Sequence, residues 1–146
     1  MSLTLILINK IVLSCFFSAA IAQTAKALLI WKKNKRFNWR DLFLAAYMPS
    51  SHTATVVALS LSLFLTEGIT NLSIAAAVLS LIVIRDVLHD KTFARKQENV
   101  LNSVIDKLIP ENSETVIWHD FHGHSLKEVF AGMIIGILVT LLIFNL

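Results

Sequence analysis

Long apolar segments constrain the fold of this chain more than any other feature. They lie at 3–31, 42–66, 72–88 and 125–146, and the first is long enough to cross a hydrocarbon layer of about 30 Å. Backbone polar groups inside a bilayer must be satisfied within the segment itself, so segments of this kind form helices. The sequence therefore predicts an all-α integral membrane bundle, with about four transmembrane helices, in a single domain over 1–146.

The composition agrees with a membrane protein. Of the 146 residues, 55% are hydrophobic and only 16% are charged, which differs from ordinary soluble domains. The net charge of +3 is concentrated beside the apolar segments, so membrane topology explains it better than nucleic-acid binding, and no nucleic-acid partner is predicted. The single cysteine, Cys15, excludes a disulfide within the chain and is interpreted as a packing residue.

Shorter elements are predicted between the apolar segments. Pro49 disfavours helix at Met48, so a short helix near 39–47, a break and a second helix from about Thr53 are expected. Turns are predicted at 67–71 and 110–115. The stretch 92–109 is predicted to be an amphipathic helix, because its apolar residues recur on one face: Phe93, Val100, Leu101, Val104, Ile105 and Leu108.

Basic residues predict the topology. One cluster follows the first apolar segment and the other follows the third: Lys32, Lys33, Lys35, Arg36 and Arg40, then Lys91, Arg95, Lys96 and Lys107. Two crossings separate the clusters, so both are expected on the cytoplasmic side of a bacterial-type inner membrane, with both termini on the other face. Residues 49–52 and 123–124 would then meet near the cytoplasmic interface.

Two glycines lie four residues apart in the last apolar segment. The spacing of Gly132 and Gly136 lets another helix approach closely, and a homo-oligomer formed through this face is one expectation.

A polar motif, Met-Pro-Ser-Ser-His-Thr at 48–53, immediately precedes an apolar run. Titratable groups are rare in membrane helices unless they have a use, and a helix N-terminus offers free N–H groups to a phosphate. In the alternative interpretation, Ser51 or Thr53 only caps the helix and His52 faces headgroup water.

A second polar stretch, 118–124, contains three of the five histidines. A metal site built on His119, His122 and His124 is the alternative here, but no cysteine pair or His-Glu-x-x-His spacing supports zinc, so neither a metal nor a cofactor is predicted. Ser125 and Glu128 match a capping box. His124 and Glu128 also share one helix face, where the carboxylate could hold the imidazole tautomer.

Three ordered motifs together resemble a known family. The segments 48–53, 86–102 and 123–132 are similar to the divergent branch of the type 2 phosphatidic acid phosphatases, which is related to acid phosphatases and vanadium haloperoxidases. The resemblance implies an all-helical membrane bundle and metal-independent hydrolysis of a phosphomonoester or diphosphate.

The resemblance also implies roles for individual residues. His124 would be the nucleophile that forms a phosphohistidine, Glu128 the carboxylate that orients it, and His52 the general acid and later the base. Ser50 and the Ser51 N–H would bind phosphate oxygens.

Basic residues would complete the phosphate site. Lys26 resembles the lysine of the first family motif, although lysines in such positions also snorkel to the interface. Trp118 replaces an arginine of the main family. Lys91 stands where the divergent branch has an arginine, so it keeps the positive charge but cannot make the two parallel hydrogen bonds of a guanidinium. Arg95, or Arg85 beside Asp86, would supply those hydrogen bonds instead.

The predicted function is therefore an integral membrane lipid phosphatase. Its substrate would be a phosphorylated lipid presented among membrane lipids, such as phosphatidylglycerol phosphate, phosphatidic acid or a prenyl phosphate. The alternative is a non-catalytic scaffold or lipid-binding protein that retains the bundle.

Overall fold

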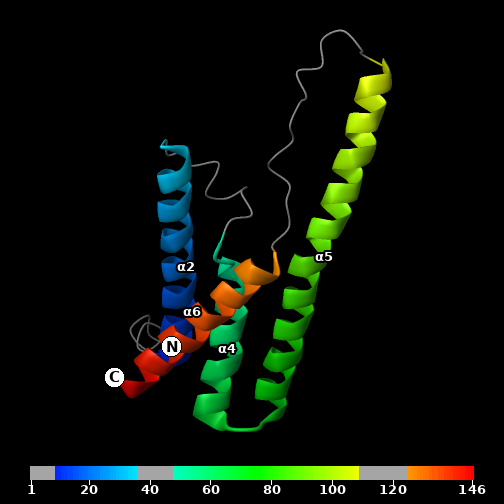
Figure 1. The fold of residues 1–146 in the computed structure, drawn as a ribbon. Helices are drawn as coiled ribbons and strands as arrows, with labels where there is room; N and C mark the ends of the chain where they lie inside the picture. The colour runs from blue at the N-terminus through cyan, green and yellow to red at the C-terminus, as the bar shows by residue number, and fades with distance from the viewer. Residues whose placement is uncertain (1–8, 36–47, 109–124) are drawn as a thin grey trace.

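The structure is a computed structural model, and it describes residues 9–35, 48–108 and 125–146. These residues form four helices, each antiparallel to the next. The helices run alternately up and down (Figure 1). They are α2 (Lys10–Asn34), α4 (Ser51–Glu67), α5 (Asn71–Leu108) and α6 (Leu126–Asn145). The predicted all-α class is confirmed, whereas the helix predicted near 39–47 and the turn at 110–115 lie outside the described residues.

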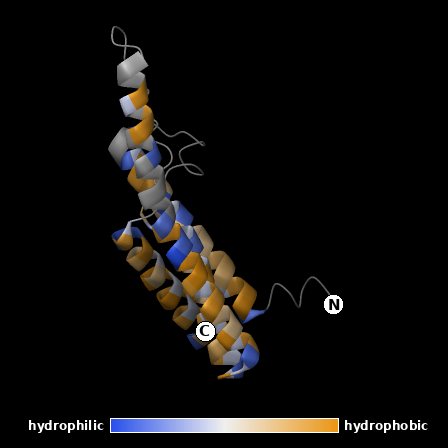
Figure 2. Ribbon diagram, turned by 90° about the vertical axis from the view of Figure 1, so that its right-hand side faces the viewer, coloured by the Kyte–Doolittle hydropathy of each residue, from blue (hydrophilic) through white to orange (hydrophobic). Residues whose placement is uncertain are grey.

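Three of these helices have the length and composition of membrane spans: Lys10–Lys32, Asn71–His89 and Leu126–Asn145. The fourth, α4, has 17 residues and is about 26 Å long, and it packs against the other three. Apolar residues cover most of the bundle surface (Figure 2). An exposed apolar surface of this kind is compatible with surrounding lipid. The prediction of an integral membrane bundle is therefore confirmed, and three of the described helices are long and apolar enough to cross a membrane.

The third apolar segment and the amphipathic stretch form one helix. The helix predicted over 92–109 is confirmed as far as Leu108, the last described residue there, but it continues the third segment, because α5 runs without interruption from Asn71 to Leu108. No glycine or proline lies between Leu88 and Thr92, so nothing in the sequence ends the helix there. The distal part of α5 therefore extends beyond the other helices (Figure 1).

Small residues allow the helices to pack closely. Ala22 of α2 and Ala54 and Ala58 of α4 are fully buried. A Cβ added at Gly136 would lie 2.6 Å from the Ala54 carbonyl oxygen, and one at Gly132 would overlap the Ser50 carbonyl oxygen. The close approach predicted from the glycine spacing is thus made to α4 of the same chain, and homo-oligomerisation stays a prediction.

The two ends of the bundle differ. At one end the start of α2 meets the end of α6, where Lys10 Nζ donates to the Phe144 carbonyl at 3.4 Å and lies 5.7 Å from the Phe144 ring centroid. Toward the other end lie the C-terminus of α2 and the N-termini of α4 and α6 (Figure 1). The end of α2 and the starts of α4 and α6 therefore lie toward the same end of the bundle.

Candidate functional site

Ser50 begins α4. It has an extended backbone, and its Oγ accepts a hydrogen bond from the Thr53 N–H at 3.3 Å and another from Thr53 Oγ1 at 3.0 Å. Ser50 is therefore the N-cap, and the alternative prediction of Ser51 or Thr53 as the cap is wrong. The side-chain oxygen of an N-cap residue accepts from the backbone N–H three residues later. Ser50 and Thr53 are three residues apart, so they have this spacing.

Ser125 begins α6 in the predicted capping box. Its Oγ accepts from the Glu128 N–H at 3.4 Å, and Glu128 Oε2 accepts from the Ser125 N–H at 2.8 Å. The predicted cap is confirmed. It holds the Glu128 carboxylate beside the backbone that follows His124 in the sequence.

The two helix starts are joined directly. The Ser50 N–H donates to the Glu128 carbonyl oxygen at 3.1 Å, although the two residues are far apart in the sequence. Next to this bond, Gly132 lies against the Ser50 carbonyl group and the Thr53 side chain. The structure therefore brings the motif at 48–53 together with the described part of the second motif, from Ser125 to Gly132.

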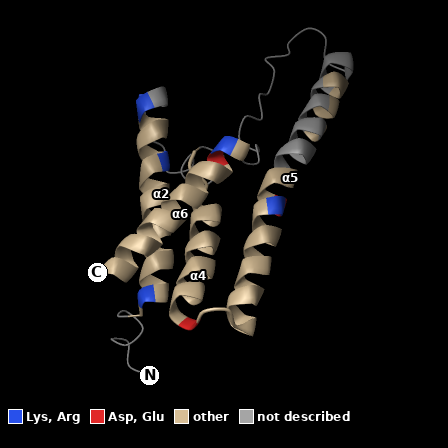
Figure 3. Ribbon diagram, turned by 60° about the horizontal axis from the view of Figure 1, so that its bottom comes forward, with Lys and Arg blue, Asp and Glu red and all other residues tan. Residues whose placement is uncertain are grey.

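Lys26 adds a positive charge from a third helix. Its residue surface is only 6% exposed, and α2 packs against both α4 and α6. Glu128 lies close enough to Lys26 for a favourable electrostatic interaction. Figure 3 shows the basic and acidic residues of the first turn of α6 near the other helices of the bundle. Lys26 is therefore a buried cation whose positive charge the Glu128 carboxylate favours.

Free backbone donors gather at the two helix starts. Within the described residues, the N–H groups of Ser51 and His52 on α4, and of Leu126 and Lys127 on α6, have no hydrogen-bond partner. The His52 side chain is exposed. Helix N-termini and cations favour anions in general, and the predicted phosphate site would use these groups.

The basic residues predicted on α5 lie at different heights. Ser80 Oγ donates to the Val56 carbonyl at 2.9 Å, which places Arg85, five residues further along α5, level with Ser51 at the start of antiparallel α4. Arg85 and Asp86 are exposed. The α5 backbone carries Lys91 about 9 Å and Arg95 about 15 Å beyond Arg85 along the helix axis.

The predicted nucleophile, His124, lies outside the described residues, as do His119 and His122 of the alternative metal site. Among the described residues, no group of three histidine, cysteine or acidic side chains could hold a metal ion. The roles predicted for His124, His52 and Glu128 stay predictions, as do those of the phosphate-binding residues. The structure adds that Ser125, the next residue after His124, is fixed beside the α4 start.

Two residues at the site were not assigned from sequence. Thr53 holds the Ser50 hydroxyl, and Gly132 lets the Ser50 carbonyl approach α6. The glycine spacing was a visible signal for close packing, but it could not identify the partner helix. The sequence indicated Thr53 only as a possible cap residue. Its hydrogen bond to Ser50 depends on the bend of the chain before α4, which the sequence does not show.

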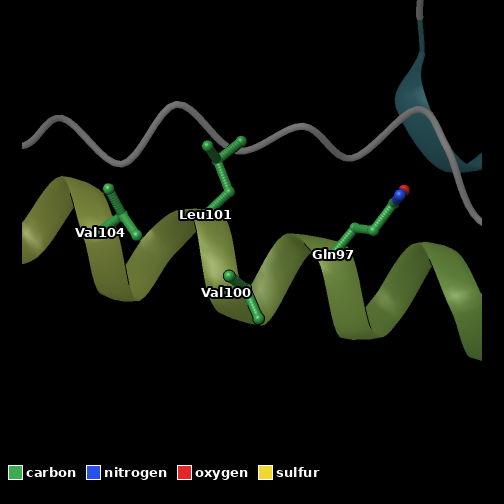
Figure 4. Close-up of a pocket in the computed structure, with 4 residues that line it drawn as sticks. All are labelled: Gln97, Val100, Leu101 and Val104. Atoms are coloured by element: carbon green, nitrogen blue, oxygen red, sulfur yellow. The ribbon is translucent and has the colours of Figure 1, made fainter.

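A separate apolar pocket lies on the distal part of α5. Its volume is about 460 Å³, and the described residues that line it are Gln97, Val100, Leu101 and Val104 (Figure 4). None of these four described residues is a predicted site residue.

The fold is that of a helical integral membrane protein in which the N-termini of two helices are joined by a hydrogen bond. The chain belongs to the Divergent PAP2 family, whose profile matches residues 7–139, a range that includes every predicted site residue. It is 30% identical over 151 residues to the uncharacterized membrane protein YuiD of Bacillus subtilis (strain 168), covering 94% of this chain and 96% of that protein. No solved structure matches. The resemblance found from the three motifs is confirmed.

Proposed function

We propose that this protein is a lipid phosphatase that hydrolyses a phosphomonoester or diphosphate through a phosphohistidine on His124. One observation carries the proposal: the hydrogen bond from the Ser50 N–H to the Glu128 carbonyl, which joins the helix start bearing His52 to the helix start that follows His124. Membership of the Divergent PAP2 family supports it, because phosphatase chemistry is the activity after which that family is described.

The chemistry needs few parts. Phosphoryl transfer depends on charge stabilisation of the equatorial oxygens, a nucleophile and an acid for the leaving group. The free N–H groups of Ser51 and His52 and the Lys26 charge supply the first part. His124 would attack phosphorus with the Glu128 carboxylate holding its tautomer, and His52 would protonate the departing alcohol. Water, deprotonated by His52, would then release phosphate.

The expected substrate is a phosphorylated lipid of the cytoplasmic leaflet, such as phosphatidylglycerol phosphate, phosphatidic acid or a prenyl phosphate. Basic residues at the site end of the bundle support this orientation in an inner membrane, since Lys32 and Lys35 end α2 there.

Phosphate release from these lipids by purified protein in a chelator tests the proposal. Wild type is expected to be active, and His124→Ala and His52→Ala are each expected to lose about 100-fold or more. His89→Ala is the matched control, because His89 is an exposed histidine of α5 outside the proposed machinery. Equal activity in all four proteins, or none across the lipid panel, would contradict the proposal.

A non-catalytic lipid-phosphate-binding protein is the second candidate, and one observation favours it. Ser50 is fully buried, and its hydroxyl is engaged by Thr53, so it serves the helix cap in this structure. Together with Trp118 in place of an arginine, this leaves fewer side-chain donors for a transition state. Binding of inorganic phosphate without turnover of any lipid would identify this second function.

A further inference from the structure

Ser50 contacts two residues of α6, Glu128 and Gly132, and one residue of its own helix, Thr53. The Ser50 N–H donates to the Glu128 carbonyl at 3.1 Å, and its hydroxyl accepts from Thr53 at 3.0 Å. Its carbonyl oxygen lies so near Gly132 that a Cβ there would overlap it. Ser50 and Thr53 are fully buried, and Gly132 is buried. The start of α4 therefore has one fixed position against α6.

We infer that Thr53 and Gly132 are positioning residues that set the spacing between the two helix starts, and hence between the free N–H groups of Ser51 and His52 and the backbone that follows His124. This inference rests on the proposed function and deepens it. Neither residue would touch the substrate. Both would act through Ser50, because Thr53 orients its hydroxyl and Gly132 admits its carbonyl.

The glycine pair provides a matched comparison. At Gly136, an added Cβ would lie 2.6 Å from the Ala54 carbonyl and 3.2 Å from Val57, so alanine there also forces α4 and α6 apart. Gly136 lies one helical turn further from Ser50. Gly132→Ala and Gly136→Ala should therefore cost similar stability, whereas only the first acts directly on the Ser50 carbonyl at the start of α4. A displacement of about 1 Å in an active site can cost about 100-fold in rate.

The experiment measures three quantities for wild type, Gly132→Ala and Gly136→Ala in nanodiscs: lipid phosphate hydrolysis, thermal unfolding, and binding of inorganic phosphate by equilibrium dialysis. Gly132→Ala is expected to lower kcat/KM by roughly 100-fold and to weaken phosphate binding by roughly tenfold, while Gly136→Ala stays within about threefold of wild type in both. Equal losses in the two variants, in proportion to their unfolding temperatures, would overturn the inference.

The two proposals fail in different ways. A wild type that binds phosphate without hydrolysing lipid, with binding weakened only by Gly132→Ala, would contradict the phosphatase and support the positioning role. An active wild type, with Gly132→Ala and Gly136→Ala indistinguishable from each other, would support the phosphatase and contradict the positioning role. A wild type that neither hydrolyses lipid phosphates nor binds phosphate would contradict both.

Thr53 provides a second test that needs no added bulk. Thr53→Ser keeps the hydroxyl that donates to Ser50, and Thr53→Val keeps the shape without it. Thr53→Val is expected to lose roughly tenfold in kcat/KM and in phosphate affinity, and Thr53→Ser is expected to remain near wild type. Should Gly132→Ala fail to fold, this pair decides alone, and equal behaviour of the two threonine variants would refute the positioning role.

Discussion

At the residue scale, Glu128 takes part in three interactions at once. Its carboxylate closes the capping box of α6, and it interacts electrostatically with buried Lys26. Its carbonyl oxygen also accepts the hydrogen bond that ties α6 to α4. One residue therefore connects three helices at the site, and capping can be separated from charge by substitution.

Comparison of Glu128→Gln with Glu128→Ala makes that separation. Glutamine can still accept from the Ser125 N–H, so its unfolding free energy is expected to stay near wild type, while alanine is expected to lose about 1 kcal/mol. Both lack the charge proposed to orient His124, so both should lose roughly 100-fold in phosphate release. Chemical unfolding and phosphate assays check this. Wild-type turnover by Glu128→Gln would show that Glu128 only caps the helix.

The two helix caps show which features of single residues could be predicted from the sequence and which could not. The capping box of Ser125 and Glu128 is local, and it was predicted correctly. Ser50 was assigned to phosphate, but the α4 cap was expected at Ser51 or Thr53, because the bend that places Ser50 there depends on packing against Glu128 and Gly132. Contacts between helices distant in sequence have no local signature.

At the element scale, α4 is the centre of the bundle. It is shorter than the other helices and packs against all three. Apolar length predicted the position of each helix well, because hydrocarbon thickness sets that length. The joining of the third span to the amphipathic stretch was not predicted, since the change from apolar to amphipathic composition marks the edge of the membrane rather than the end of α5.

One hydrogen bond between α5 and α4 tests this packing. Ser80 Oγ lies 2.9 Å from the Val56 carbonyl oxygen, so Ser80→Ala is expected to lower the unfolding free energy by about 0.6 kcal/mol, as is typical between membrane helices. Reversible unfolding in mixed micelles measures it. Ser103→Ala is the control, because, among the described residues, exposed Ser103 donates only within α5, whereas Ser80 donates both to Ala76 of α5 and to Val56 of α4. Equal effects of the two substitutions would contradict the assigned α4–α5 register.

At the scale of the whole molecule, the alternating helices bring the end of α2 and the distal part of α5 toward one end of the bundle. The end of α2 and the starts of α4 and α6 lie toward that end, and the pair formed by Lys10 and Phe144 marks the other. The positive-inside pattern predicted this arrangement from charge counts alone. The side of the membrane on which the site faces is a further prediction.

Cysteine labelling checks the orientation in a Cys15→Ser background. Lys35→Cys and Gln97→Cys should react with an impermeant maleimide only in inverted inner-membrane vesicles, because both positions belong to the end proposed as cytoplasmic. Lys10→Cys and Leu146→Cys should react only from the opposite face. Labelling of Lys35→Cys and Gln97→Cys from different sides would separate the helix starts and contradict the fold.

The central claim is that the paired helix starts form a phosphoryl-transfer site, and trapping the covalent intermediate tests it most directly. Wild type mixed with ³²P-labelled lipid phosphate and quenched in alkali is expected to carry label on His124, since phosphohistidine survives base but not acid. His124→Ala should carry none, while His52→Ala should keep whatever label it forms for longer, because the water-activating base is gone. Lipid phosphate hydrolysis by wild type without alkali-stable label, or equal labelling of His124→Ala, would contradict the account.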